Sequence, residues 1–270
     1  MIYDYSKKAV KESLNALKIE NHKMREGYVH KLLDYYNGNN TKYYIEGRFD
    51  LDAFREVPPY EANITKKFIN KMSRVYTVGA DRNVNEKYDR ISVLKDSKMK
   101  HIERMTRLIG TIACRIMYVD DDMPHFDYQP IYYFHPFFGE DPFKPVAISY
   151  PLMNYTDDVS NSEICQYIHW NDEVYIIFDE NGRVIEEKPH GYGTLPFVFT
   201  HREHQSDAFY VEGANDIMSA NEHINITMTE MQLGLRFQMF GQPVVSGADL
   251  GNNQRFGSDV ILELPSDANY

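Results

Sequence analysis

The sequence predicts an α+β fold with a helical N-terminal part, then an antiparallel β meander, then one long helix. Three observations support this prediction. Helical apolar spacing dominates the first third of the chain, apolar runs separated by turn residues fill residues 131–187, and an unbroken helical pattern covers residues 213–240. Because the strands follow one another directly, the pattern favours α+β over alternating βαβ units.

Helical steps of apolar residues predict two helices within residues 6–37, which end at the turn residues Gly38 and Asn39. Residues 41–46 are rich in aromatic and β-branched types, so we expect a short strand there. Asn63 is a candidate N-cap for the next helix, predicted over residues 63–78. One side of that helix is basic and could meet phosphate or an acidic partner, although a solvated face is the favoured interpretation.

Residues 97–117 also carry apolar side chains at helical spacing, ending with Ile112 and Ile116, and are predicted to form one helix. Gly110 lies inside this pattern, where we expect it to mark close packing. In the β region, Asn181-Gly182 between two apolar runs predicts a hairpin. A further strand is predicted at residues 195–199.

The last helix is predicted to span about 28 residues, on the order of 40 Å, and to end at Gly241 and Pro243. Two apolar lines run along it. The first line consists of Ile217, Ile224, Met228, Met231, Leu235 and Met239, and the second of Ile226, Leu233, Phe237 and Phe240. A helix with two apolar lines packs against two neighbours or lies in a core. It is therefore either the core helix of one chain or a helix in a ring of copies.

Charge is distributed unevenly. Residues 1–110 carry 22 Lys and Arg against 15 Asp and Glu, whereas residues 111–270 carry 7 against 25. An acidic surface of that size repels nucleic-acid phosphates, which disfavours a conventional DNA-binding domain. Cys114 and Cys165 lie in apolar runs and are expected to be buried free thiols of a protein made in a reducing cytoplasm. We expect no membrane span, because no window approaches 18 apolar residues.

The motifs of common enzyme chemistry are missing from the sequence. It contains no phosphate-binding loop, dinucleotide fingerprint, nucleophile elbow or zinc motif. Asp120-Asp121-Asp122 lacks the spacing of a calcium loop and is expected to be a hairpin turn. The His201, Glu203, His204 and Asp207 group is expected to be a surface or interface cluster. We therefore predict no catalytic residue, no cofactor and no metal, and expect the protein not to be an enzyme.

Several loose motifs, in a fixed order over residues 35–245, resemble the portal (head–tail connector) proteins of tailed bacteriophages. The motifs are Tyr35-Tyr36-x-Gly38, Asn63-x-x-x-Lys67-Phe68-Ile69-Asn70, Gly193-x-Leu195-Pro196-Phe197-Val198, and Gly241-Gln242-Pro243-Val244-Val245-x-Gly247 after the long helix. Order and spacing carry the resemblance. The family's second stem helix, tunnel loop and C-terminal crown have no counterpart, so the expected match is to the N-terminal wing and stem portion.

The resemblance implies a wing-like α+β domain over residues 1–210, a stem-like helix over residues 211–241, and the start of a clip-like segment over residues 242–270. It also implies a ring, expected to hold twelve copies, at one capsid vertex of the virion, through which double-stranded DNA is packaged and ejected. The ring would be assembled in the host cytoplasm. Its expected partners are the major capsid protein, the packaging ATPase (terminase), and head-completion or tail adaptor proteins.

On this interpretation the long helix carries the candidate residues for subunit packing or tunnel lining. Asn221, Asn225, Gln232 and Gln238 are candidates for the polar side, Glu222 and Glu230 for an acidic lining, and Leu233 and Phe237 for contacts between subunits. A charge introduced at Leu233 or Phe237 is then expected to block assembly.

Two other classes of function stay open. One is a metal-dependent nucleic-acid-processing enzyme that uses Asp120-Asp121-Asp122 or the His201 cluster. The other is a monomeric acidic binding module, in which the second apolar line is covered within one chain.

Overall fold

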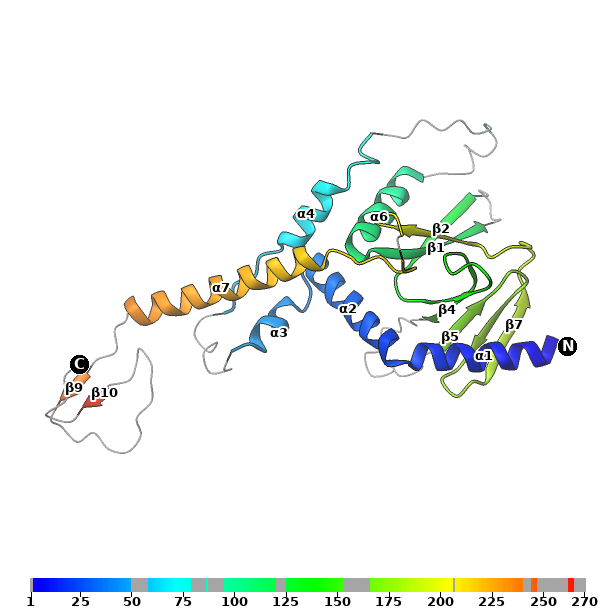
Figure 1. Cartoon of the computed structure of the whole chain (residues 1–270). Helices are drawn as coiled ribbons and strands as arrows, with labels where there is room; N and C mark the ends of the chain where they lie inside the picture. The colour runs from blue at the N-terminus through cyan, green and yellow to red at the C-terminus, as the bar shows by residue number, and fades with distance from the viewer. Residues whose placement is uncertain are drawn as a thin grey trace. The chain divides into compact units, whose positions relative to one another are not determined.

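The computed structural model describes residues 2–49, 58–78, 86, 95–119, 125–152, 166–205, 207–239, 244–246 and 262–264. The chain divides into two compact units (Figure 1). Unit 1 comprises Met1–Asn37 and Thr65–Asn215, and unit 2 comprises Gly38–Ile64 and Asp216–Tyr270. Helices and antiparallel sheets both occur, which confirms the α+β class.

The helices of unit 1 lie before its strands. They are α1 (Ile2–Lys18), α2 (Glu20–Asn37), α4 (Ile64–Met72), which begins one residue before the unit, and α6 (Lys95–Ile109). The two helices predicted within residues 6–37 are confirmed. Val29, Leu32 and Tyr36 of α2 recur at helical steps and are buried, so packing of one apolar face stabilises this helix.

The predicted β meander is a five-stranded antiparallel sheet whose spatial order follows the sequence. Its strands are β3 (His135–Phe138), β4 (Pro145–Leu152), β5 (Gln166–Trp170), β6 (Val174–Phe178) and β7 (Val184–Pro189). The Asn181-Gly182 hairpin is confirmed between β6 and β7, where Gly182 has a φ of 81°. Only glycine adopts that left-handed conformation readily.

The five-stranded sheet is covered on both faces. On one face lies α1 (Figure 1). Its Ala9 and Val10 pack against Ile176 and Phe178. On the other face lies a three-stranded antiparallel sheet, ordered β2 (His125–Ile131), β1 (Thr111–Val119) and β8 (Phe197–His201). The core cluster of this second interface consists of Ala113, Ile131, Phe134, Ile148, Tyr150, Ile168, Trp170, Phe197 and Phe209.

The single helix predicted over residues 97–117 is wrong. Helix α6 ends at Ile109, Gly110 turns the chain with a φ of 95°, and β1 begins at Thr111. The two isoleucines that suggested a helix, Ile112 and Ile116, are four residues apart. Four residues is both a helical step and two strand repeats, so this spacing fits either structure.

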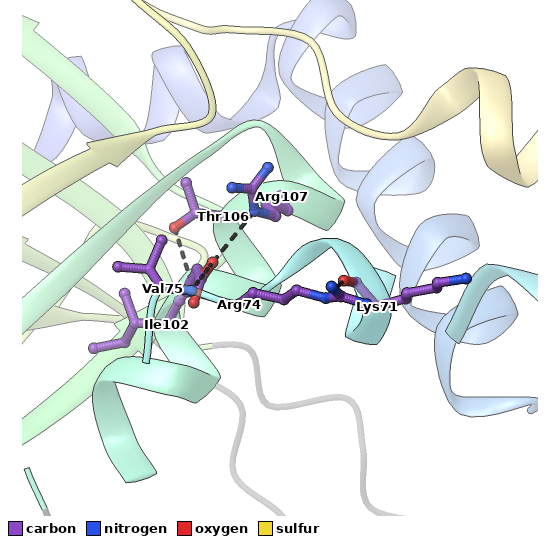
Figure 2. A network of polar contacts seen from close by, with 7 residues as sticks. Lys71, Arg74, Val75, Ile102, Thr106 and Arg107 are labelled. Carbon is purple, nitrogen blue, oxygen red and sulfur yellow. Dashed lines mark hydrogen bonds and ion pairs between the residues drawn. The ribbon is translucent and has the colours of Figure 1, made fainter. Parts of the chain in front are cut away.

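Helix α4 ends six residues before the predicted end. Beyond Met72, the Val75 N–H donates to the Glu103 carboxylate of α6 at 3.3 Å, and the Arg74 side chain donates to the Lys71 carbonyl at 2.8 Å (Figure 2). Glu103 also accepts from Arg107 at 3.4 Å. Side chains thus satisfy backbone groups that further helical turns would have paired, which stabilises the early helix end.

Unit 2 contains α3 (Thr41–Glu46) and the long helix α7 (Asn215–Met239), whose first residue still belongs to unit 1. It also contains β9 (Val244–Ser246) and β10 (Leu262–Leu264), which pair in parallel. The strand expected at residues 41–46 is therefore wrong. Thr41 and Ile45 are buried at a four-residue step, and Lys42 pairs with Glu46 at 3.4 Å. Packing and this helical ion pair override the strand propensity of the tyrosines.

Candidate interaction helix

Helix α7 is the element on which the sequence placed every candidate site residue. The structure confirms it as a helix of 25 residues, about 37 Å long. Its described side chains include a buried polar line and an exposed apolar line.

The buried polar line, here called the amide ladder, consists of Asn221, Asn225 and Thr229. Asn221 Oδ1 accepts from Ile64 N at 2.7 Å, and its Nδ2 donates to Ala62 O at 2.8 Å. Asn225 Oδ1 accepts from Ala62 N at 2.9 Å. Thr229 Oγ1 accepts from the N–H of Tyr60 at 2.9 Å.

The amide ladder can form because the repeat of the helix nearly equals the repeat of the extended segment beside it. Four residues of helix rise about 6 Å, and two residues of extended chain rise about 6.6 Å. Side chains at steps of four on α7 therefore meet alternate N–H groups of residues 60–64 along an antiparallel path. The helix replaces a neighbouring strand as the hydrogen-bond partner of this segment, and the backbone N–H groups of Tyr60, Ala62 and Ile64 are all paired.

The amide ladder includes two of the candidate residues for subunit packing or tunnel lining, Asn221 and Asn225. Asn221 is 1 % exposed and Asn225 is 0 % exposed, and contacts within unit 2 occupy both amides. A channel-lining role for either residue would require residues 60–64 to move away. Their part in subunit packing or tunnel lining stays a prediction.

The structure separates the other candidates. Glu222 is buried and pairs with Arg48 at 3.7 Å, whereas Glu230 is exposed. Gln232 and Leu233 are half-buried. Phe237 and Gln238 fall within the helical backbone, but their side chains lie outside the described part of the structure.

The exposed apolar line consists of Ile224, Met231 and Leu235, which are 42 %, 53 % and 55 % exposed. Steps of seven and four residues place them on one face of α7. These three residues belong to the first apolar line of the sequence pattern, whereas the predicted subunit contacts, Leu233 and Phe237, belong to the second. The exposure of the first line could not be predicted, because the same spacing is found on a helix face that is buried within one chain.

The alternative metal site receives no geometric support from the described residues. His201 Nδ1 bonds to Thr111 Oγ1 at 3.0 Å, and burial lowers the pKa of His201. No group of three His, Cys, Asp or Glu side chains in the described ranges is placed to hold a metal ion.

Asp120-Asp121-Asp122 lies outside the described residues, although β1 and β2 on either side pair as a hairpin does, with Val119 opposite His125. Cys114 is confirmed as a buried free thiol, and burial raises its pKa to about 11. Cys165 lies outside the described residues.

Within the described part of the chain, none of the helices has the length and apolar content needed to cross a bilayer. Comparison with protein-family models and with curated proteins finds no match.

Proposed function

We propose that this chain is a portal subunit of a tailed phage, which forms a ring at one capsid vertex through which double-stranded DNA is packaged and ejected. In this proposal α7 is the stem helix, residues 242–270 begin the clip, and the ring holds about twelve copies. The ring is structural, and a separate packaging ATPase docked on the clip moves the DNA. Capsid and adaptor proteins are its other partners.

The observation that carries the proposal is the exposed apolar line of α7. Ile224, Met231 and Leu235 present three large apolar side chains on one helix face, beside a polar line already occupied within unit 2. Apolar side chains gathered on one helix face are typical of an interaction surface. A neighbouring copy that packs along α7 would cover them.

A matched pair of charge insertions tests this surface. Leu235→Asp places a carboxylate in the exposed apolar line, whereas His223→Asp places the same charge on an exposed position of the same helix, about 100° around from Ile224. We expect sedimentation velocity to show assembled rings for the wild type and H223D and dissociated subunits for L235D, with unchanged helical circular dichroism. Normal assembly of L235D would contradict the stem assignment.

A further inference from the structure

A cavity of about 450 Å³ lies in unit 1. It is formed by the end of β1, by the β5–β6 hairpin, and by the chain between β7 and β8. Arg115, Met117, Trp170, Tyr175, His190 and Tyr192 supply its principal side chains. Its volume falls within the range of ordinary small-molecule sites.

The cavity wall is aromatic and ordered. Trp170 stacks on Tyr175 with ring centres 4.9 Å apart, and His190 lies 5.4 Å from Trp170 and 5.3 Å from Tyr192. His190 Nε2 donates to the Asn171 carbonyl at 3.0 Å, and its Nδ1 accepts from Tyr192 N at 3.2 Å. Hydrogen bonds on both nitrogens fix the orientation of the ring, so His190 contributes a flat face to the wall.

Arg115 is the charged group of the cavity. Its guanidinium carbon lies 5.2 Å from the Trp170 ring, and its Nη2 contacts Met117 Sδ at 2.7 Å. Among the residues that the structure describes, no carboxylate forms an ion pair with Arg115, and no acidic side chain lines the cavity. The nearby Glu186 is already paired with Lys188 and accepts from Tyr175.

The polar atoms behind the wall are also incompletely paired. Arg115 Nε and Trp170 Nε1 are buried without a hydrogen-bond partner among the described residues. Burial raises the pKa of the neighbouring Tyr150, and the Arg115 and Trp170 side chains offset part of that rise. A half-buried cation without a counterion is unfavourable, and an anion bound beside it removes that penalty.

We propose that this cavity binds a flat aromatic group that carries a carboxylate. The rings of Tyr175, His190 and Tyr192 would contact the aromatic body, and the Arg115 guanidinium would pair with the carboxylate. Aromatic walls often bind cations instead. Here Arg115 already lies over Trp170, and its positive charge disfavours a cationic ligand.

The chain provides its own reporter, because Trp170 is the only tryptophan in the sequence. We would titrate the full chain with benzoate, with its neutral isostere benzamide, and with benzylamine as the cation, and follow Trp170 fluorescence. We expect benzoate to shift the emission saturably and to bind at least about tenfold more tightly than benzamide. Benzylamine should bind most weakly.

Two variants separate the contribution of the Arg115 charge to binding from that of the aromatic wall. Arg115→Met keeps an apolar stem and removes the charge, so benzoate should bind no better than benzamide. Tyr192→Ala removes an exposed wall residue and should weaken both ligands to a similar extent. If R115M does not fold, the Y192A variant and the comparison of the three ligands on the wild type still test whether the cavity binds an aromatic carboxylate. Equal binding of benzoate and benzamide, preferential binding of benzylamine, or no saturable signal from any probe would overturn the proposal.

Discussion

At the scale of single residues, two glycines allow a close backbone crossing in unit 1. A Cβ on Gly110 would lie 2.1 Å from the Val211 carbonyl oxygen, and a Cβ on Gly213 would lie 2.3 Å from the Leu108 carbonyl oxygen. Hydrogen bonds hold the crossing together, since Ala214 N donates to Leu108 O at 2.8 Å and Arg202 N donates to Gly110 O at 2.7 Å. The expectation of close packing at Gly110 is thus confirmed, but at a turn rather than within a helix.

Gly110→Ala is expected to destabilise the protein by about 3 kcal/mol or more, because it combines an unfavourable positive φ with a clash against backbone. Urea unfolding measures the effect. Gly27→Ala is the control, because that helical glycine has nothing within 4 Å of the added Cβ. It should raise stability by about 0.5–1 kcal/mol. Similar unfolding midpoints for the two variants would contradict the crossing.

Another residue-scale feature is the buried histidine His169. Its Nδ1 lies 3.1 Å from Ser13 Oγ and 2.9 Å from Ser149 Oγ, and Nε2 has no hydrogen-bond partner among the described residues. Burial lowers the pKa of His169 from 6.5 to about 4. The neutral ring therefore belongs to the native packing of α1 on the five-stranded sheet.

This histidine predicts acid sensitivity. Because the folded-state pKa lies below the unfolded one, the stabilisation is complete above about pH 6.5 and is lost as the pH falls toward 4. By pH 4.5 the loss attributable to His169 is roughly 2–3 kcal/mol. Between pH 7.5 and 4.5, the free energy of unfolding of His169→Asn should fall by roughly 2–3 kcal/mol less than that of the wild type, as measured by urea unfolding at both pH values. An equal fall in both proteins would contradict a neutral, buried His169.

At the scale of elements, the amide ladder explains why α7 carries buried asparagines. The sequence pattern identifies Asn221 and Asn225 as candidates for a polar side of the helix, but it does not identify their partners. Residues 60–64 lie more than 150 positions earlier, and their backbone hydrogen bonds leave no trace in side-chain periodicity.

Asn225→Ala should release residues 60–64 from α7 locally. The amide protons of Tyr60, Ala62 and Ile64 are the donors of the ladder, so their hydrogen exchange reports on it directly. We expect exchange at Ala62 to accelerate about tenfold or more, corresponding to the loss of one buried hydrogen bond. Glu230→Ala, an exposed change on the same helix, is the control and should leave these amides unchanged. Unaltered protection in N225A would contradict the ladder.

Elements whose sequence pattern fits only one type of secondary structure could be predicted, whereas elements whose pattern fits both helix and strand could not. The bounds of α7 and the Gly182 hairpin follow from unbroken periodicity and from turn chemistry. The strand at Thr111 and helix α3 could not be assigned, because a four-residue step fits both structures and because tertiary contacts override weak propensity.

At the scale of the whole molecule, the α+β class could be predicted, but the pairing of distant strands could not. Strand β8 begins at Phe197 and pairs with β1, which begins 86 residues earlier at Thr111. This pairing places Phe197 of the core cluster opposite Arg115 of the cavity. The convergence of Arg115, Trp170 and Tyr192 could not be predicted, because each lies on a different segment of the chain. A single tryptophan in a strand pattern was the only available clue.

Ring formation by this chain is tested most directly by the native mass of the longest natural form of the protein, combined with single-particle imaging. We expect a closed ring of about twelve copies with an axial hole. A clean monomer of that form at micromolar concentration would contradict the portal proposal and favour a monomeric binding module.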